Sequence, residues 1–202
     1  MGTILLLVLV LLGGAGVYWL VRRASSDPLA GQVLSITSYD VASDNPSFEV
    51  GGLRFVEVFR SPNGRFLTGR TEPEARGKTI VAVAEARTGR VLFSVRVALA
   101  NHPMVANDGT LIVEDMIAED SPRSVLLAFR HRQKVWEARF DARIYTTGLS
   151  EDSKQVFVCT RKSPVPSHSE KTFIYEVRTG RLLRHFSGID EAALHGKFPG
   201  SA

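Results

Sequence analysis

A passage of about 45 residues recurs three times between residues 53 and 188, and this recurrence limits the fold more than any other feature. Each copy consists of four short runs rich in Val, Ile, Leu, Phe and Thr, with turn residues between them. Gly64, Gly109 and Ser153 occupy matching places, 45 and 44 positions apart. The pattern predicts an all-β protein made of repeated antiparallel units.

Turn residues divide each copy into strands. The first two runs are separated by Asn-Gly at 63–64 in one copy and by Asp-Gly at 108–109 in the next, pairs that tolerate positive φ. The last two runs are separated by Thr-Gly at 88–89 and 179–180, within the octets EARTGRVL and EVRTGRLL. Arg-Gln at 132–133 takes that place in the middle copy, where we expect a somewhat longer loop. The octet is therefore predicted to be a turn rather than a catalytic motif.

Four antiparallel strands per unit, with these two glycine turns, resemble the blade repeat of β-propellers of the WD40-like and YVTN-like kind. The resemblance spans residues 53–188, although the G-H and W-D dipeptides are absent and Trp136 is followed by Glu137. Three blades are fewer than close a ring, so the resemblance implies a partial or open propeller. Either residues 31–50 supply strands of a further, partial blade, or the fan stays open and another chain covers its edges. A β-sandwich or barrel is the alternative.

An uncharged segment lies near the N-terminus. Thr3–Val21 is long enough, at about 1.5 Å per residue, to cross a bilayer as a transmembrane helix. Tyr18 and Trp19 lie at its C-terminal end, where amphipathic rings favour the headgroup level, and Arg22 and Arg23 follow as a charged stop. A cleaved signal peptide would need a basic start, and a buried core helix would be unusual without charges over this length.

The segment and the repeats together suggest how the chain is organised. We divide it into an anchor with its basic stop (1–23), a linker with further strands (24–52), a repeat domain (53–188, with copies at 53–100, 101–142 and 143–188) and a C-terminal tail (189–202). Basic flanks tend to remain in the cytoplasm, so we expect the N-terminus outside and the repeats in the cytoplasm, with a periplasmic or extracellular domain as the alternative. Cys159 is the only cysteine, which fits a reducing compartment.

Composition argues against several kinds of function. The net charge is +4, and removing the arginines at 22 and 23 from the 25 basic residues leaves 23 against 21 acidic ones. These charges are interleaved, so nucleic acid is not an expected partner. The five histidines lack metal-ligand spacing, and no phosphate loop, dinucleotide fingerprint or nucleophile elbow occurs. We therefore predict no catalytic residue, metal or cofactor.

The loops between the second and third strands are the predicted binding surface. In propellers these loops lie at the end opposite the tight turns, and loops on a rigid scaffold commonly carry binding residues. Loops 71–78, 118–123 and 161–171 contain proline and charges of both signs. The predicted partner-binding residues are Glu72, Glu74, Arg76, Glu119, Asp120, Arg123, Arg161, Lys162, His168 and Lys171.

These features together predict a single-pass, membrane-anchored β-repeat protein. Its expected partners are the lipid bilayer and another protein chain, in a membrane complex or a homo-oligomer, with the chain as an accessory or assembly subunit. One alternative is an extracytoplasmic small-molecule-binding protein or enzyme that uses a propeller-like pocket. Another is a degenerate piece of a longer propeller.

Overall fold

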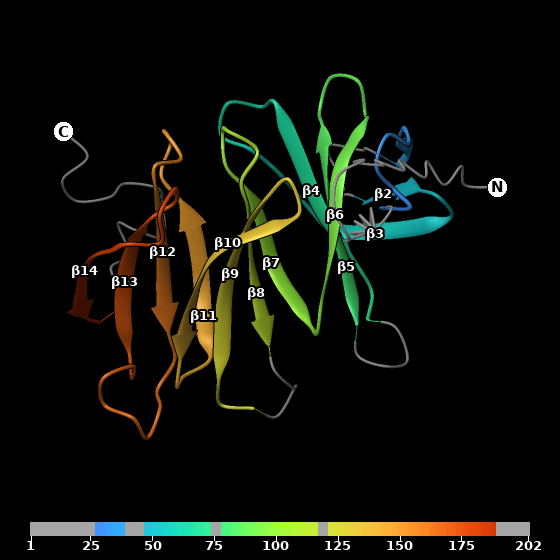
Figure 1. Cartoon of the computed structure of the whole chain (residues 1–202). Helices are drawn as coiled ribbons and strands as arrows, with labels where there is room; N and C mark the ends of the chain where they lie inside the picture. Colours follow the sequence, from blue (N-terminus) through green and yellow to red (C-terminus); the bar gives the residue numbers. More distant parts are fainter. Residues whose placement is uncertain (1–26, 39–46, 74–77, 117–120, 189–202) are drawn as a thin grey trace, which may run out of the picture.

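The computed structural model describes residues 27–38, 47–73, 78–116 and 121–188, in which all regular secondary structure is antiparallel β-strand (Figure 1). The strands form three sheets, of six, four and four strands. Each sheet contains a meander of four strands in chain order, which is the blade of a β-propeller. The predicted all-β fold with about three propeller-type repeats is therefore confirmed.

The first sheet has the order β1-β2-β3-β4-β5-β6. Its strands are β1 (Ser35–Ser38), β2 (Ser47–Val50), β3 (Leu53–Arg60), β4 (Phe66–Thr71), β5 (Thr79–Glu85) and β6 (Val91–Val97). The strands β3 to β6 form the first blade. The strands β1 and β2 extend it beyond β3 and do not form a sheet of their own.

The second and third sheets are plain four-stranded meanders. The second contains β7 (Ala100–Val105), β8 (Leu111–Met116), β9 (Ser124–Arg130) and β10 (Gln133–Phe140). The third contains β11 (Ile144–Leu149), β12 (Gln155–Thr160), β13 (Lys171–Glu176) and β14 (Leu182–Ser187).

The first sheet is rolled so that its two edges meet. Gly31 and Leu34 donate backbone hydrogen bonds of 2.9 Å to carbonyls at 89–91, beside the start of β6. Residue 34 leads directly into β1 at the opposite edge of the sheet, so one stretch of chain joins both edges. The rolled sheet encloses an apolar cluster that includes Phe48 and Phe55, whose ring centroids lie 4.9 Å apart.

Two further apolar layers hold the three sheets together. Successive residues of a strand point to opposite faces, so Leu111 and Val113 of β8 pack toward the first sheet while Ile112 packs toward the third. All three side chains are fully buried. This two-sided burial explains why the central strands read as continuous apolar runs rather than as alternating ones.

Side chains at the first tight turn of each blade connect one blade to the next. The N–H of Asn63 donates to Oδ1 of Asn107 at 2.8 Å, and Nδ2 of Asn107 donates to the carbonyl of Glu151 at 3.3 Å. Each pair is separated by 44 residues in sequence. The turns between the first and second strands therefore lie side by side at one end of the molecule.

The repeated octet is a structural turn at both places. The N–H of Gly89 donates to the carbonyl of Glu85, and that of Gly180 donates to Glu176, both at 2.8 Å. The Thr88 hydroxyl donates to the carboxylate of Glu85 and accepts from the N–H of Arg90, and Thr179 makes both bonds with Glu176 and Arg181. The Glu, Thr, Gly and Arg positions of E-x-x-T-G-R thus all take part in the turn, which confirms that the octet is a turn.

The expectation of a longer loop in the middle repeat is wrong. Two residues, His131 and Arg132, connect β9 to β10, whereas five residues connect the corresponding strands in the outer repeats. His131 and Arg132 have φ of 48° and 71°, so they adopt the left-handed conformations of a tight hairpin without glycine. Positive φ at non-glycine residues costs energy, which made this turn hard to recognise from residue types.

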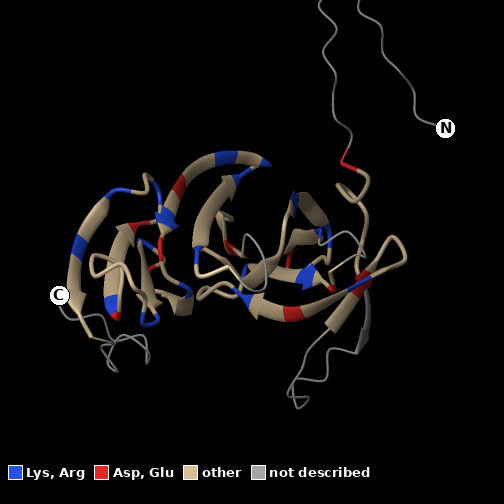
Figure 2. Ribbon diagram, turned by 90° about the horizontal axis from the view of Figure 1, so that it is seen from below, with Lys and Arg blue, Asp and Glu red and all other residues tan. Residues whose placement is uncertain are grey.

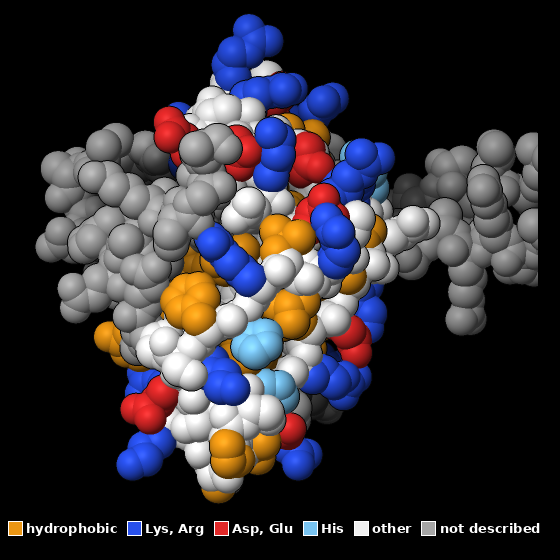
Figure 3. Space-filling view, turned by 90° about the vertical axis from the view of Figure 1, so that its left-hand side faces the viewer, with side chains coloured by type: hydrophobic (Ala, Val, Ile, Leu, Met, Phe, Trp, Pro, Cys, Tyr) orange, Lys and Arg blue, Asp and Glu red, His pale blue; other side chains and the backbone are white. Residues whose placement is uncertain are grey.

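The strand β14 forms one side of the molecule (Figure 3). It pairs only with β13 among the described strands, and Leu182 and Leu183 are 44% and 39% exposed. Apolar and basic side chains mix on this side, as Figure 3 shows.

The membrane anchor predicted at Thr3–Val21, with Tyr18, Trp19 and the arginine stop, lies outside the described residues, as does the tail 189–202. In the described part of the chain, no helix is long and apolar enough to cross a membrane.

Candidate partner-binding face

The loops between the second and third strands of the blades lie at one end of the molecule, opposite the tight turns (Figure 1). Figure 2 views the molecule from this end. We call it the loop end, and it comprises described residues 72–73, 78, 121–123 and 161–170. The opposite end, with the turns 61–65, 86–90 and their repeats, is the turn end.

Six of the ten residues predicted for partner binding are described. These are Glu72, Arg123, Arg161, Lys162, His168 and Lys171. The other four, Glu74, Arg76, Glu119 and Asp120, lie outside the described residues. Glu72 belongs to the first blade, and the remaining five border the second and third blades.

Asp141, in the connection from β10 to β11, brings two of the predicted residues together. Its carboxylate lies 3.1 Å from Nε of Arg123, and its N–H donates to Nδ1 of His168 at 3.0 Å. The His168 ring packs edge-on against Phe140 and Phe173, with centroids 6.0 and 5.8 Å away. Asp141 was not predicted, because nothing in the sequence relates a connection between blades to loops on either side.

Further hydrogen bonds fasten the same two loops to the connection at 141–143. Nε of Arg143 donates to the carbonyl of Ser121 at 3.0 Å, and its own carbonyl accepts from the N–H of Arg161 at 2.8 Å. The hydroxyl of Ser163 donates to the carbonyl of Asp141. The loops of the second and third blades are thus held in one arrangement.

The first strand of every blade bulges close to the loop end. Register shifts occur between Val56 and Phe59 in β3, between residues 101 and 104 in β7, and between residues 144 and 146 in β11. Glu57 and His102 adopt φ of 50° and 44° at the first two bulges. Bulges re-aim side chains, and the third one leaves Tyr145 47% exposed. The guanidinium of Arg161 lies 5.4 Å from its ring centroid, within range of a cation–π contact.

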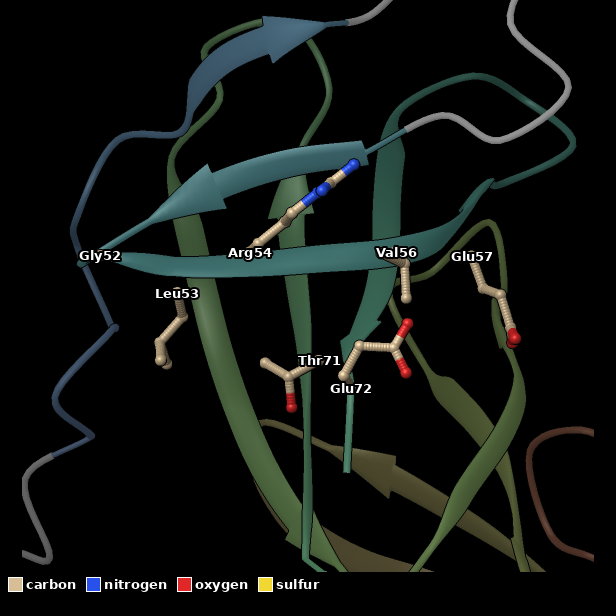
Figure 4. Close-up of a pocket in the computed structure, with 7 residues that line it drawn as sticks. All are labelled: Gly52, Leu53, Arg54, Val56, Glu57, Thr71 and Glu72. Carbon is tan, nitrogen blue, oxygen red and sulfur yellow. The ribbon is translucent and has the colours of Figure 1, made fainter. Parts of the chain in front are cut away.

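A cavity of about 540 Å³ opens beside β3 in the first blade (Figure 4). Its lining residues are Gly52, Leu53, Arg54, Val56, Glu57, Thr71 and Glu72. In Figure 4, Leu53, Val56 and Glu57 extend from β3 toward Thr71 and Glu72, while Arg54 extends from the other side of the strand. Two carboxylates and two apolar side chains therefore face the cavity.

Both carboxylates of the cavity lie near Arg70. Nη2 of Arg70 lies 2.5 Å from Glu57, and Nη1 lies 4.0 Å from Glu72. Burial raises the pKa of Glu57, but the hydrogen bond and charge of Arg70 outweigh it, so the pKa falls below its ordinary value. Glu57 therefore remains ionised, which does not suit it to act as a general acid near neutral pH.

Glu114 of β8 is a buried carboxyl close to the loop end. It is 1% exposed and accepts hydrogen bonds from Ser124 at 2.7 Å and from Asn101 at 3.0 Å. Burial raises its pKa, and these hydrogen bonds offset only part of the rise. The carboxyl joins β7, β8 and β9 within the second blade.

The raised pKa of Glu114 predicts how stability depends on pH. A carboxyl whose pKa is higher in the folded than in the unfolded state contributes stability below its unfolded pKa, and this contribution is lost as pH rises through the folded pKa. We therefore expect Glu114→Gln to gain stability relative to the unmodified protein as pH rises from about 4 to about 8, measured by urea denaturation.

Asp152 provides a control of opposite sign. The N–H of Lys154 and the hydroxyl of Ser150 lower its pKa, so its contribution is present above the unfolded pKa and is lost on acidification. Asp152→Asn should lose stability relative to the unmodified protein as pH rises from about 2 to about 4, and should change little further from about 4 to about 8. If the stability difference between Glu114→Gln and the unmodified protein stays constant with pH, the raised pKa of Glu114 is contradicted.

The described residues contain no group of three or more His, Cys, Asp or Glu side chains that could hold a metal ion. Cys159 is buried and contacts the Thr172 hydroxyl at 3.3 Å.

No family model matches the chain, and no curated protein matches it. Among solved structures, it is similar to Hsv2 from Kluyvelomyces marxianus (12% identity, TM-score 0.41), covering 74% of this chain and 48% of that one. It is also similar to BamB from Moraxella catarrhalis (15%, TM-score 0.46, 69% and 40% covered). A third is the β-propeller domain of the Trilobed protease from Pyrococcus furiosus (10%, TM-score 0.45, 79% and 59% covered).

The chain spans 40–59% of the length of these three structures. At such identities the likeness concerns the fold alone. The propeller-type blades are established by the strand order and by the repeated turns of this chain itself.

Proposed function

We propose that this chain is a single-pass, membrane-anchored β-repeat protein whose loop end binds another protein, as an accessory or assembly subunit of a membrane complex. The observation that carries the proposal is the junction at Asp141, which holds the loops of two blades in one arrangement. The fixed loops present Arg161 and Lys162 to solvent, and Arg123 keeps 66% of its side chain exposed while paired. A preformed, charged and extended surface suits a protein partner.

The rival function is small-molecule binding or catalysis in a pocket. The cavity beside β3 has a volume typical of ligand sites, but both of its carboxylates lie beside Arg70. One oxygen of Glu57 is thus already engaged by Arg70. The wider loop end, with contributions from separate blades, supports the protein-binding function better.

The proposal includes the membrane topology expected from the sequence. The arginines at 22 and 23 favour an N-terminus outside and a repeat domain in the cytoplasm. In that topology, the loop end is available to a membrane protein in the same bilayer or to a peripheral subunit.

A pull-down of the full-length chain from detergent-solubilised native membranes tests the proposal. We expect a second protein chain to be recovered in a fixed ratio, because a preformed surface loses little entropy on association. A matched sample solubilised in high salt should recover less of it, since the exposed groups are charged. Recovery of the monomer alone would contradict the proposal.

A further inference from the structure

The side chain of Asp27, the first described residue, binds to the blades through hydrogen bonds and an ion pair. The carboxylate is 2% exposed and accepts hydrogen bonds of 2.6 Å from both the N–H and the hydroxyl of Ser94 in β6. It also lies 3.6 Å from Nε of Arg132, in the turn between β9 and β10. The chain therefore enters the domain at a fixed point beside β6 and β10, the last strands of the first two blades.

Only a short segment connects the predicted membrane anchor to Asp27. Residues 24–26 separate the arginine stop from Asp27. An extended chain spans at most about 3.6 Å per residue, so Arg23 and Asp27 are no more than about 14 Å apart. If 3–21 cross a bilayer, the edge of the domain that carries Asp27 must lie next to the headgroups.

The surface around the fixed point is basic. Six basic side chains lie on β6, on β10 or in the turns that precede these strands, and they are Arg87, Arg90, Arg96, Arg132, Lys134 and Arg139. The acidic side chains of the same edge are Asp27 and Glu137. Arg96 follows Ser94 by two residues and so projects from the same face of β6. Asp27 is buried, and Glu137 already pairs with Lys134 and Arg139. The exposed charge is therefore mainly positive.

Two apolar side chains are exposed on the same edge. Val33, beside the start of β6, is 66% exposed, and Val135 of β10 is 43% exposed. Exposed apolar groups among basic ones match the chemistry of a membrane surface, where phosphates attract the cations and the upper acyl region accepts small apolar groups.

We propose that this edge, formed by β6, β10 and residues 27–34, docks on the anionic lipid headgroups of the bilayer in which the chain is anchored. The inference rests on the membrane anchor of the proposed function. Docking fixes the orientation of the domain, because the fastened entry point and the basic edge together prevent free rotation on the tether. The loop end then has a fixed direction relative to the bilayer.

Full-length protein in lipid nanodiscs provides the test. A fluorophore on Val135→Cys reports on the edge, and the same fluorophore on Ser167→Cys, an exposed position, reports on the loop end, since the native Cys159 is buried. With headgroup-quencher lipids, we expect quenching at 135 to be about twofold greater in discs containing phosphatidylglycerol than in phosphatidylcholine discs. Quenching at 167 should not change with lipid charge.

Charge reversal separates docking from mere proximity. The triple variant Arg90→Glu, Arg96→Glu and Lys134→Glu should abolish the dependence of quenching at 135 on lipid charge. The control Lys162→Glu, at the loop end, should preserve it. Circular dichroism confirms that each variant is folded.

The outcomes distinguish this inference from the proposed function. A folded chain that does not enter nanodiscs overturns both the anchor and the docking. A chain that enters the discs but shows no difference between neutral and anionic lipid at position 135 overturns the docking alone and leaves the anchor in place.

Discussion

Replacing Gly180 with alanine is expected to lower the free energy of unfolding by about 3–5 kcal/mol, because two costs combine at this position. Gly180 has φ of 71°, a conformation that side chains disfavour. A Cβ there would also lie 2.5 Å from Cγ of Trp136. The indole cannot move aside freely, since its Nε1 donates to the carbonyl of Val177 at 2.7 Å between the second and third blades.

Gly89 is the matched control, since it occupies the same place in the matching octet. Its φ is 69°, but the nearest atom to an added Cβ is Cβ of Leu34 at 3.5 Å, an ordinary contact. Gly89→Ala should therefore cost only about 1–2 kcal/mol. Urea denaturation of the detergent-solubilised protein measures both. Equal losses would mean that the Trp136 contact does not constrain the turn.

Replacing Phe140 with alanine is expected to lower the free energy of unfolding by about 3–5 kcal/mol. Phe140 is 2% exposed, and its ring centroid lies 5.3 Å from that of Phe173 on the opposing blade. The cavity left behind would separate the second and third blades. The substitution would also remove the ring against which the imidazole of His168, at the loop end, packs.

The measurement is thermal and urea unfolding followed by tryptophan fluorescence, since Trp136 lies in the same apolar layer as Phe140. Phe59→Ala serves as a control, because Phe59 is 38% exposed and its removal should cost less than about 1 kcal/mol. A loss at Phe140 no larger than the loss at Phe59 would show that this layer does not hold the two blades together.

The repeat could be predicted from sequence because its turns depend on local chemistry. Gly64 and Gly109 have φ of 71° and 83°, and glycine is the residue that adopts such values without strain. The turn at His131 and Arg132 uses the same conformations without glycine, and Arg132 interacts with the distant Asp27. Tertiary contacts of this kind leave no local signal.

The closure of the first sheet shows the same limit. The sequence predicts either that residues 31–50 supply strands of a further, partial blade or that the fan stays open for another chain. The expected further blade is wrong, because β1 and β2 extend the first sheet instead. Gly31 and Leu34 also pair beside the start of β6. Pairing at both edges depends on how the sheet rolls, which the alternation of residues does not encode.

The candidate site was predictable only in outline. The positions of the loops follow from the order of strands in a blade, so residues such as Arg161 could be named from the repeat. Asp141 and the bulge at Tyr145 could not, because each acts through neighbours that the fold brings together. The candidate loops thus follow from the sequence, whereas the contacts that hold them in place depend on the fold.

The most direct test of the loop end compares two charge-reversal variants in the membrane pull-down. Arg161→Glu with Lys162→Glu alters the loop end, whereas Arg87→Glu with Arg178→Glu alters exposed, matching positions of the two octets at the turn end. We predict that the loop variant loses its partner while the turn variant retains it. Loss of the partner from the turn variant, with retention by the loop variant, would contradict a partner-binding loop end.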